Sequence, residues 1–286
     1  MTHVIISEAY YKKQVIEQVT NVVESSCFIE CRFENFESSE EGALVSSGDN
    51  FLHIEKTEFF RCSSKTKCAW VKKIMGNLTM KCCSLTECYG VNGNTNQLGT
   101  AMGTSECNTK LEEVTFYLCW KQISPHADNV FGISKGTADV KDLNCSHCIS
   151  DDGGLVGNFY FVKEGASIRY VQGVQGIEFD VCEVWETDQT ISYMNAINNS
   201  FTHEFFGIVR AVLTVEKGCF FLNNKNNDKG TVITIDCISD TYPKATTNVP
   251  LSTIYLEMKN CRKSARFSSK ITYRSSFLCL HLLLIK

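Results

Sequence analysis

The sequence is poor in several features that would place it in a familiar class. Only three prolines occur among 286 residues, and the formal net charge is −4. Proline cannot donate to a strand ladder, so its scarcity suits a chain built of paired strands. The small charge, with no basic run beside clustered aromatic residues, makes nucleic acid an unexpected partner. Apolar runs at the two ends, residues 4–6 and 277–285, are too short for a secretory signal and a bilayer-spanning helix, so no complete membrane span is expected.

One apolar pattern is written repeatedly along the chain. Its anchor residues Phe28, Ile54 and Met80 are 26 residues apart both times (54 − 28 and 80 − 54). Within each unit, apolar residues lie two apart and then change phase, as expected for short strands joined by a corner. A fixed period of this size indicates a solenoid, in which stacked units bury one another's apolar faces. The fold class predicted is therefore all-β, a single right-handed parallel β-helix.

Later units keep the pattern with looser spacing, as expected if insertions loop out at corners. The interval between Ile168 and Val215 is 47 residues (215 − 168), which leaves room for one further coil whose register between residues 177 and 210 is not assigned. About eight or nine coils are predicted in total. The corresponding residues of the later units are Leu111, Val140, Ile168, Val215 and Met258.

The two ends depart from the repeat. Tyr11, Val15, Val19 and Val22 lie on one helical face, so residues 1–24 are predicted to form a short amphipathic segment that caps the first coil, with membrane-surface binding as the alternative. Residues 25–265 are assigned to the β-helix and residues 266–286 to a C-terminal tail. The tail either covers the last coil, begins a truncated membrane span or is an extraneous extension.

Sixteen cysteines occur, and they could form disulfides, bind a metal ion or pack as free thiols. Disulfides suit small secreted scaffolds, and this chain is much longer. A metal site would need more than the lone Cys145 and Cys148 pair. The third role is packing, because Cys is small and tolerates burial. Two groups recur at equivalent places of successive units, so mostly free, buried thiols are predicted: Cys62, Cys88, Cys119 and Cys148, and Cys31, Cys83 and Cys261.

The cysteine and phenylalanine pattern, followed by a Gly-Ala-Leu-Val-like segment, resembles the right-handed β-helix repeats of protist surface proteins, of the trichomonad type, that are similar to chlamydial polymorphic outer membrane proteins. This resemblance covers about residues 25–262 and implies a cell-surface or extracellular location. It implies host or cell-surface glycans or proteins as partners. The residues that carry it are Cys31, Phe33 and 42–45; Thr57, Phe59 and Cys62; Cys145, Cys148 and 153–156; and Phe220, Asn223 and 230–233.

The enzymatic alternative is a polysaccharide lyase or glycoside hydrolase, since many β-helix proteins act on polysaccharides. Such a site needs two or three carboxylates that converge on one face of adjacent coils. The candidates are Asp139, Asp142, Asp151 and Asp152. Asp151 and Asp152 also suit a solvated turn before a glycine.

The function expected is that of a non-catalytic adhesion or recognition module, acting as a monomer without cofactor or metal. Its long, repetitive outer surface is the kind through which solenoids bind. Trp70, Trp120, Trp185 and Tyr193 are aromatic residues that would stack on sugars or anchor a partner if they lie outside the coil. A further alternative is a truncated family member without independent function.

Overall fold

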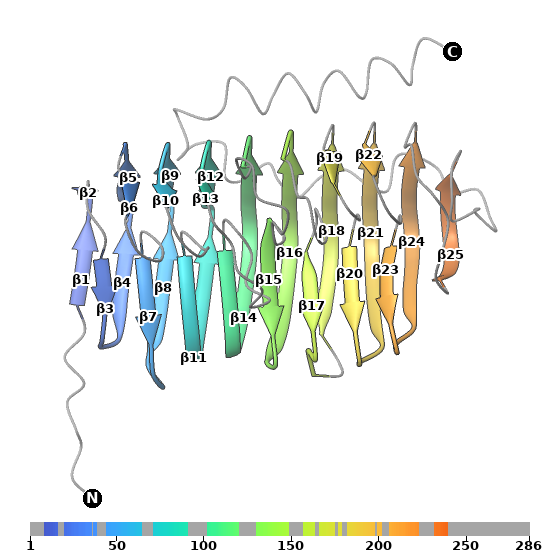
Figure 1. The fold of residues 1–286 in the computed structure, drawn as a ribbon, viewed down its shortest axis with the longest axis horizontal. Helices are drawn as coiled ribbons and strands as arrows, with labels where there is room; N and C mark the ends of the chain where they lie inside the picture. The colour runs from blue at the N-terminus through green and yellow to red at the C-terminus, as the bar shows by residue number, and fades with distance from the viewer. Residues whose placement is uncertain are drawn as a thin grey trace, which may run out of the picture.

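The structure, a computed structural model, shows an all-β solenoid (Figure 1). No helix occurs among the residues that it describes, and every strand pairing there is parallel. The predicted fold class is thereby confirmed. The described residues are 9–16, 20–35, 37–38, 44–64, 71–90, 102–119, 130–148, 157–163, 166–174, 177–178, 182–197, 199–201, 206–222 and 232–239.

The longest column of paired strands runs the length of the rod. Each member pairs in parallel with the next, so the column has ten rungs, compared with the eight or nine coils predicted. In order, the members are β1 (Ala9–Lys12), β4 (Ser26–Ile29), β8 (Phe51–Glu55), β11 (Val71–Lys81), β14 (Met102–Tyr117), β16 (Thr137–Ser146), β18 (Ser167–Val174), β21 (Gln189–Ile197), β24 (Leu213–Leu222) and β25 (Val232–Ser239).

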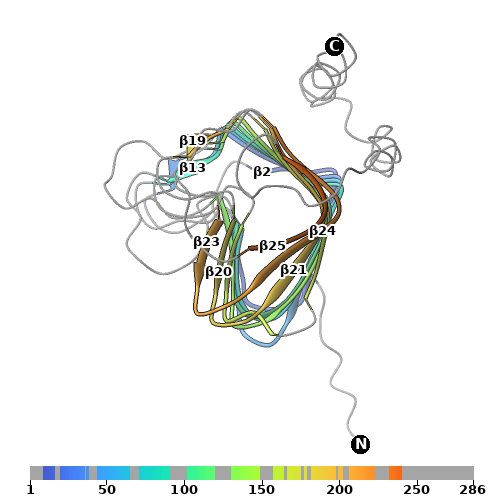
Figure 2. The same ribbon diagram turned by 90° about the vertical axis from the view of Figure 1, so that its right-hand side faces the viewer.

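We call this column the first wall. A second and a third wall complete the coils, and Figure 2 shows the walls viewed along the rod. The second wall contains β2 (Val15–Ile16), β5 (Arg32–Glu34), β9 (Glu58–Phe60) and β12 (Ser84–Thr86), and then the C-terminal parts of β14 and its successors. The third contains β3 (Thr20–Val22), β7 (Leu44–Ser47), the first residues of β11 and β14, β15 (Phe131–Ser134), β17 (Asn158–Tyr160), β20 (Cys182–Trp185) and β23 (Phe206–Val209). Short strands lie beyond the second wall: β6 (Glu37–Ser38), β10 (Ser63–Ser64), β13 (Tyr89–Gly90), β19 (Ile177–Glu178) and β22 (Ser200–Phe201).

The register predicted from the repeat is confirmed. Phe28 lies opposite Ile54, and Ile54 lies opposite Met80. The further coil expected between Ile168 and Val215 is present, because Ile191 of β21 pairs with both residues. The last predicted anchor, Met258, lies outside the described residues.

The predicted helical segment at the N-terminus is wrong for the residues that the structure describes there. Residues 9–16 and 20–22 form the strands β1, β2 and β3, which pair with β4, β5 and β7. Parallel pairing satisfies the backbone of this segment and lets Tyr11 stack on Phe28, with ring centroids 4.5 Å apart. A helical face and a strand that changes phase at a corner give similar apolar spacing over so few residues.

The interior is filled by apolar side chains and by thiols. Phe33 and Phe59 are fully buried and stack at 4.7 Å between ring centroids. The predicted cysteine positions within the described chain are buried and free, whereas Cys261 lies outside it. Each thiol donates to a carbonyl of the preceding coil, as Cys88 does to Phe59 at 3.4 Å and Cys119 to Leu85 at 3.3 Å. Burial raises the pKa of Cys83 to about 12, so this thiol remains a protonated donor.

Candidate functional site

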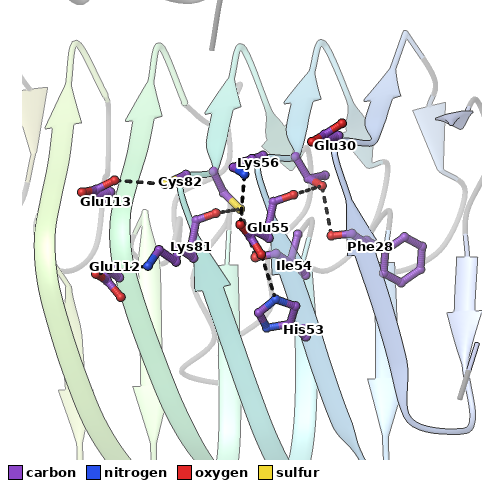
Figure 3. Close-up of polar contacts among 12 residues, drawn as sticks. Phe28, Glu30, His53, Ile54, Glu55, Lys56, Lys81, Cys82, Glu112 and Glu113 are labelled. Carbon is purple, nitrogen blue, oxygen red and sulfur yellow. Dashed lines mark hydrogen bonds and ion pairs between the residues drawn. The ribbon is translucent and has the colours of Figure 1, made fainter. Parts of the chain in front are cut away.

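A column of charged side chains marks the corner between the first and second walls. Its residues adopt positive φ, 55° at Glu30, 50° at Lys56 and 56° at Glu113. Their backbone N–H groups donate to the next coil, from Lys56 to the Lys81 carbonyl at 2.9 Å, for example. The left-handed conformation costs free energy for a non-glycine residue, and the ladder bond offsets it. We call the column Glu30, Lys56, Cys82, Glu113 and Asp142 the charged corner. Four of its residues are charged and Cys82 is disulfide-bonded, and Figure 3 labels all of them except Asp142.

The row of residues just before this corner carries charges that alternate in sign from coil to coil. Glu55, Lys81, Glu112 and Lys141 lie opposite one another on successive coils. Lys81 Nζ is 3.6 Å from Glu112 Oε1, and Lys56 Nζ is 3.3 Å from Glu55 Oε1. Although desolvation raises the pKa of Glu55, hydrogen bonds and charges from Lys56 and His53 outweigh it and hold the pKa below its usual range. The row is therefore internally paired.

Glu113 is a carboxyl group in this region whose pKa is raised, in contrast to the lowered pKa of Glu55. Its Oε2 lies 3.0 Å from Cys82 Sγ (Figure 3). Desolvation raises the pKa of Glu113, the negative charges of Asp142 and Glu112 add to this, and Lys81 and Lys141 oppose it. Glu113 was not predicted from the sequence as a site residue. The signal that could have found it is its place in the repeat, one coil before Asp142.

Two of the four predicted aspartates are described, and they lie at different places on β16. Asp139 lies on the outward row of β16 and is half-buried. Asp142 lies at the charged corner, where its side chain is 3% exposed and Oδ2 is 3.7 Å from Lys141 Nζ. Asp151 and Asp152 lie outside the described residues. A substrate has little access to Asp142, because its neighbours cover it.

The possible zinc ligands Cys145 and Cys148 point into the coil, and both are fully buried. Their neighbour His147 occupies a corner with φ 57° and contacts Tyr117 edge to face, at 5.4 Å between ring centroids. Within the described ranges, no group of three or more His, Cys, Asp or Glu side chains could hold a metal ion.

Aromatic side chains project outward from the second wall. Phe60 and Tyr117 occupy one outward row with Thr86 between them, one residue per coil. All three are half-buried. The guanidinium carbons of Arg32 and Arg61 lie 5.2 Å and 4.7 Å from the centre of the Phe60 ring. We call the row Phe60, Thr86 and Tyr117 the aromatic strip.

Two of the four aromatic residues that the sequence offers either for ligand contact or for core packing are described. Trp185 is half-buried and stacks on Tyr160 at 4.6 Å between ring centroids, with an interplanar angle of 20°. Its Nε1 donates to Glu183 at 2.5 Å. Tyr193 is half-buried at a corner with φ 57°. Trp70 and Trp120 lie outside the described residues.

A lysine buried in the coil interior has no counterpart in the sequence analysis. Lys73 is fully buried, and its ammonium donates to the Gly48 carbonyl at 2.9 Å and to Asn50 Oδ1 at 2.6 Å. Burial lowers its pKa, although the negative charges that Cys107 and Asp49 can carry oppose this. The oxygens of one coil therefore hold the amine of the next, which is a structural role.

The raised pKa of Glu113 predicts a pH-dependent stability. The folded protein disfavours the ionised form, so the contribution to stability is complete below the ordinary value of 4.5 and is lost as pH rises through the raised pKa. We expect Glu113→Gln to become more stable relative to the parent chain as pH increases across this window. Urea unfolding at a series of pH values measures it.

A second variant sharpens this measurement. Lys141→Met removes a charge that lowers the pKa of Glu113, so the loss of stability should extend to higher pH in that variant. Parallel stability profiles for Glu113→Gln and the parent chain would show that Glu113 titrates alike in the folded and unfolded states.

Comparisons with protein-family models, with curated proteins and with solved structures find no match. Among the described residues, no helix is long and apolar enough to span a bilayer. The function is therefore argued from the geometry of the rod itself.

Proposed function

We propose that this chain is a non-catalytic recognition module that binds glycans, at or near a cell surface, through the outer face of its second wall. The observation that carries the proposal is the aromatic strip. Two half-exposed aromatic residues lie two coils apart on one outward row of a rigid wall, which separates them by about 10 Å.

The chemistry around the strip suits a polyhydroxylated ligand. Aromatic faces and edges provide apolar contact, and polar groups beside them fix orientation. Arg61 Nε and Glu87 Oε2 pair at 2.7 Å in the adjoining corner, with half or more of the arginine side chain exposed. Their hydrogen-bonding groups and the Thr86 hydroxyl lie along the direction of the rod, so an extended chain of sugars would meet them in succession.

The enzymatic alternative, a polysaccharide lyase or hydrolase, would use the charged corner. Glu113 has the raised pKa expected of a general acid, and Asp142 occupies the same corner one coil away. The burial of Asp142 opposes this alternative, because both carboxyl groups must reach the scissile bond. A chain that cleaves polysaccharides and loses this activity in Glu113→Gln would establish the alternative in place of the recognition module.

A glycan array probed with the purified full chain tests the proposal. We expect binding to a restricted set of oligosaccharides, and a loss of about tenfold or more in affinity for Phe60→Ala and for Tyr117→Ala, since stacked aromatic residues are typical binding hot spots. Isothermal titration with one positive oligosaccharide gives the affinities.

The matched control is Phe51→Ala, which removes a half-buried aromatic residue from the outward side of the first wall. Its affinity should equal that of the parent chain. Two results would refute the proposal that the aromatic strip binds glycans. One is an array on which no glycan binds, and the other is an equal loss of affinity in Phe60→Ala, Tyr117→Ala and Phe51→Ala.

A further inference from the structure

The corner between the third and first walls, drawn at the bottom of Figures 1 and 2, carries an ordered series of side chains. The residue after each third-wall strand has positive φ there, as at Met75 (60°) and Lys135 (52°). Strand register places these residues in one column, because the residues before them pair from coil to coil. We call this column the corner ridge: Met75, Glu106, Lys135, Phe161, Glu186 and Arg210, preceded by Gly48.

The ridge repeats one chemical order twice. An exposed apolar residue is followed by an acid and then by a base, first Met75, Glu106 and Lys135, and then Phe161, Glu186 and Arg210. Met75 and Phe161 are 41% and 43% exposed. Lys135 Nζ lies 4.0 Å from Glu106 Oε1, and Arg210 pairs with Glu186.

The two apolar side chains of the ridge are only partly covered by their own coil, although the Phe161 ring lies 5.6 Å from the Tyr160 ring between centroids. Phe161 is bulky and adopts φ 52°, a conformation that costs free energy, and its exposed part gains no burial free energy in the single chain. Only four large hydrophobic residues are exposed in the described part of the chain, and two of them lie on this ridge. Met75 and Phe161 lie three rungs apart on the ridge with the Glu106 and Lys135 pair between them, so each would give apolar contact to a partner that covers the ridge.

Two copies of the ridge that run in opposite directions are complementary in charge. In an antiparallel arrangement centred between the Glu106 and Lys135 rungs, Glu106 faces the partner's Lys135. One rung outward, Met75 faces the partner's Phe161, and one rung farther Gly48, which has no side chain, faces the partner's Glu186. A parallel arrangement in register would instead set Glu106 against the partner's Glu106, which is repulsive.

We propose that two copies of this chain associate side by side and antiparallel through the corner ridge, with the two-fold axis between the Glu106 and Lys135 rungs. The four central charges then form a square of alternating sign, and an apolar pair flanks it on each side. A contact of this kind is isologous and closes at two subunits. The proposal replaces the monomer expected from the sequence.

The rows beside the ridge suit the same arrangement. The row before the corner contains Ile74, Ser105, Ser134 and Tyr160, so it adds apolar atoms next to Met75 and Phe161 and no charge at the centre. On the other side, Asn77, Asn108 and Thr137 form a neutral ladder, in which Asn108 Nδ2 donates to Asn77 Oδ1 at 3.0 Å. No charge in these rows opposes the central square.

The expected strength follows from the size of the ridge. In this arrangement the two ridges overlap from Gly48 to Glu186, over five intervals of about 4.8 Å, which gives a length of about 24 Å. A contact this narrow belongs to the small end of specific interfaces, so we expect a dimer that dissociates on dilution. Its exposed ion pairs are screened by salt, so dissociation should increase with ionic strength.

Sedimentation equilibrium of the full chain, over a range of concentrations and at low and high salt, tests the proposal. We expect a monomer–dimer equilibrium. Glu106→Lys and Lys135→Glu each set like charges against one another and should weaken the dimer by at least about tenfold. The double variant Glu106→Lys/Lys135→Glu restores opposite charges across the axis and should dimerise like the parent chain.

Two further variants test the apolar pair. Because Met75 contacts the partner's Phe161, the effects of Met75→Ser and Phe161→Ser on dimerisation should be non-additive in the double variant. Glu30→Lys reverses an exposed charge at the charged corner and should leave dimerisation unchanged. Far-ultraviolet circular dichroism checks that each variant is folded.

Three outcomes would overturn the proposal. They are a monomer at every concentration, association that continues beyond two subunits, and a double charge swap that fails to restore the dimer. The last result would locate any dimer at a surface other than the corner ridge.

Discussion

Replacing Phe59 by Asp is expected to lower the free energy of unfolding by at least about 4 kcal/mol. Phe59 is fully buried and stacks on Phe33. Loss of the aromatic side chain alone costs about 3–5 kcal/mol, and an unpaired carboxylate among apolar neighbours adds a further penalty. Because coils contact only their nearest neighbours, the damage should begin at this coil and separate the rod there.

Chemical denaturation monitored by circular dichroism measures this effect. The matched control is Phe60→Asp, the same change one residue along the chain. Phe60 points outward beside Arg32 and Arg61, so its replacement should change the stability by no more than about 1 kcal/mol. Equal losses in the two variants would refute the inward register of β9.

Replacing Gly136 by Ala is expected to cost about 3 kcal/mol. A Cβ at this position would lie 2.0 Å from the carbonyl oxygen of Cys107 on the preceding coil. That oxygen belongs to the backbone of the stack, so the clash can be relieved only if two coils move apart. Thermal unfolding of the variant provides the measurement.

Gly48→Ala separates this clash from backbone strain. Gly48 has φ +96°, and a Cβ there meets nothing within 4 Å. Its replacement should therefore cost only the strain of a positive φ, on the order of 1–2 kcal/mol. If Gly136→Ala loses no more stability than Gly48→Ala, the coils can move apart at little cost in free energy.

Much of the fold could be predicted from the sequence because its repeat is regular. The spacing of Phe28, Ile54 and Met80 predicted both the parallel pairing and its register. The recurrent cysteines predicted columns of buried thiols for the same reason, since one side chain in each coil must fill one place in the interior. The N-terminal coil was missed, because its short strands lack the spacing that identifies later units.

The functional surfaces could be predicted much less well. Corner and outward residues do not have to be apolar, so no pattern in the sequence marks them. The sequence does not show that Phe60 shares an outward row with Tyr117, or that Met75 lies in one column with Phe161. Variable loop lengths conceal these relations, because residues that are neighbours across coils lie at unequal distances along the chain. The predicted aspartates show the same difficulty, since only the corner geometry reveals that Asp142 is covered.

The sequence alone determined that this protein is a stack of parallel coils, which interior positions are apolar, and which of them hold thiols. Burial imposes these choices on every coil, so they are visible as a period. Only the tertiary structure decided which outward side chains meet. Whether an acid on one coil faces a base or another acid on the next depends on how the corners align, and that alignment gives the charged corner, the aromatic strip and the corner ridge their chemistry.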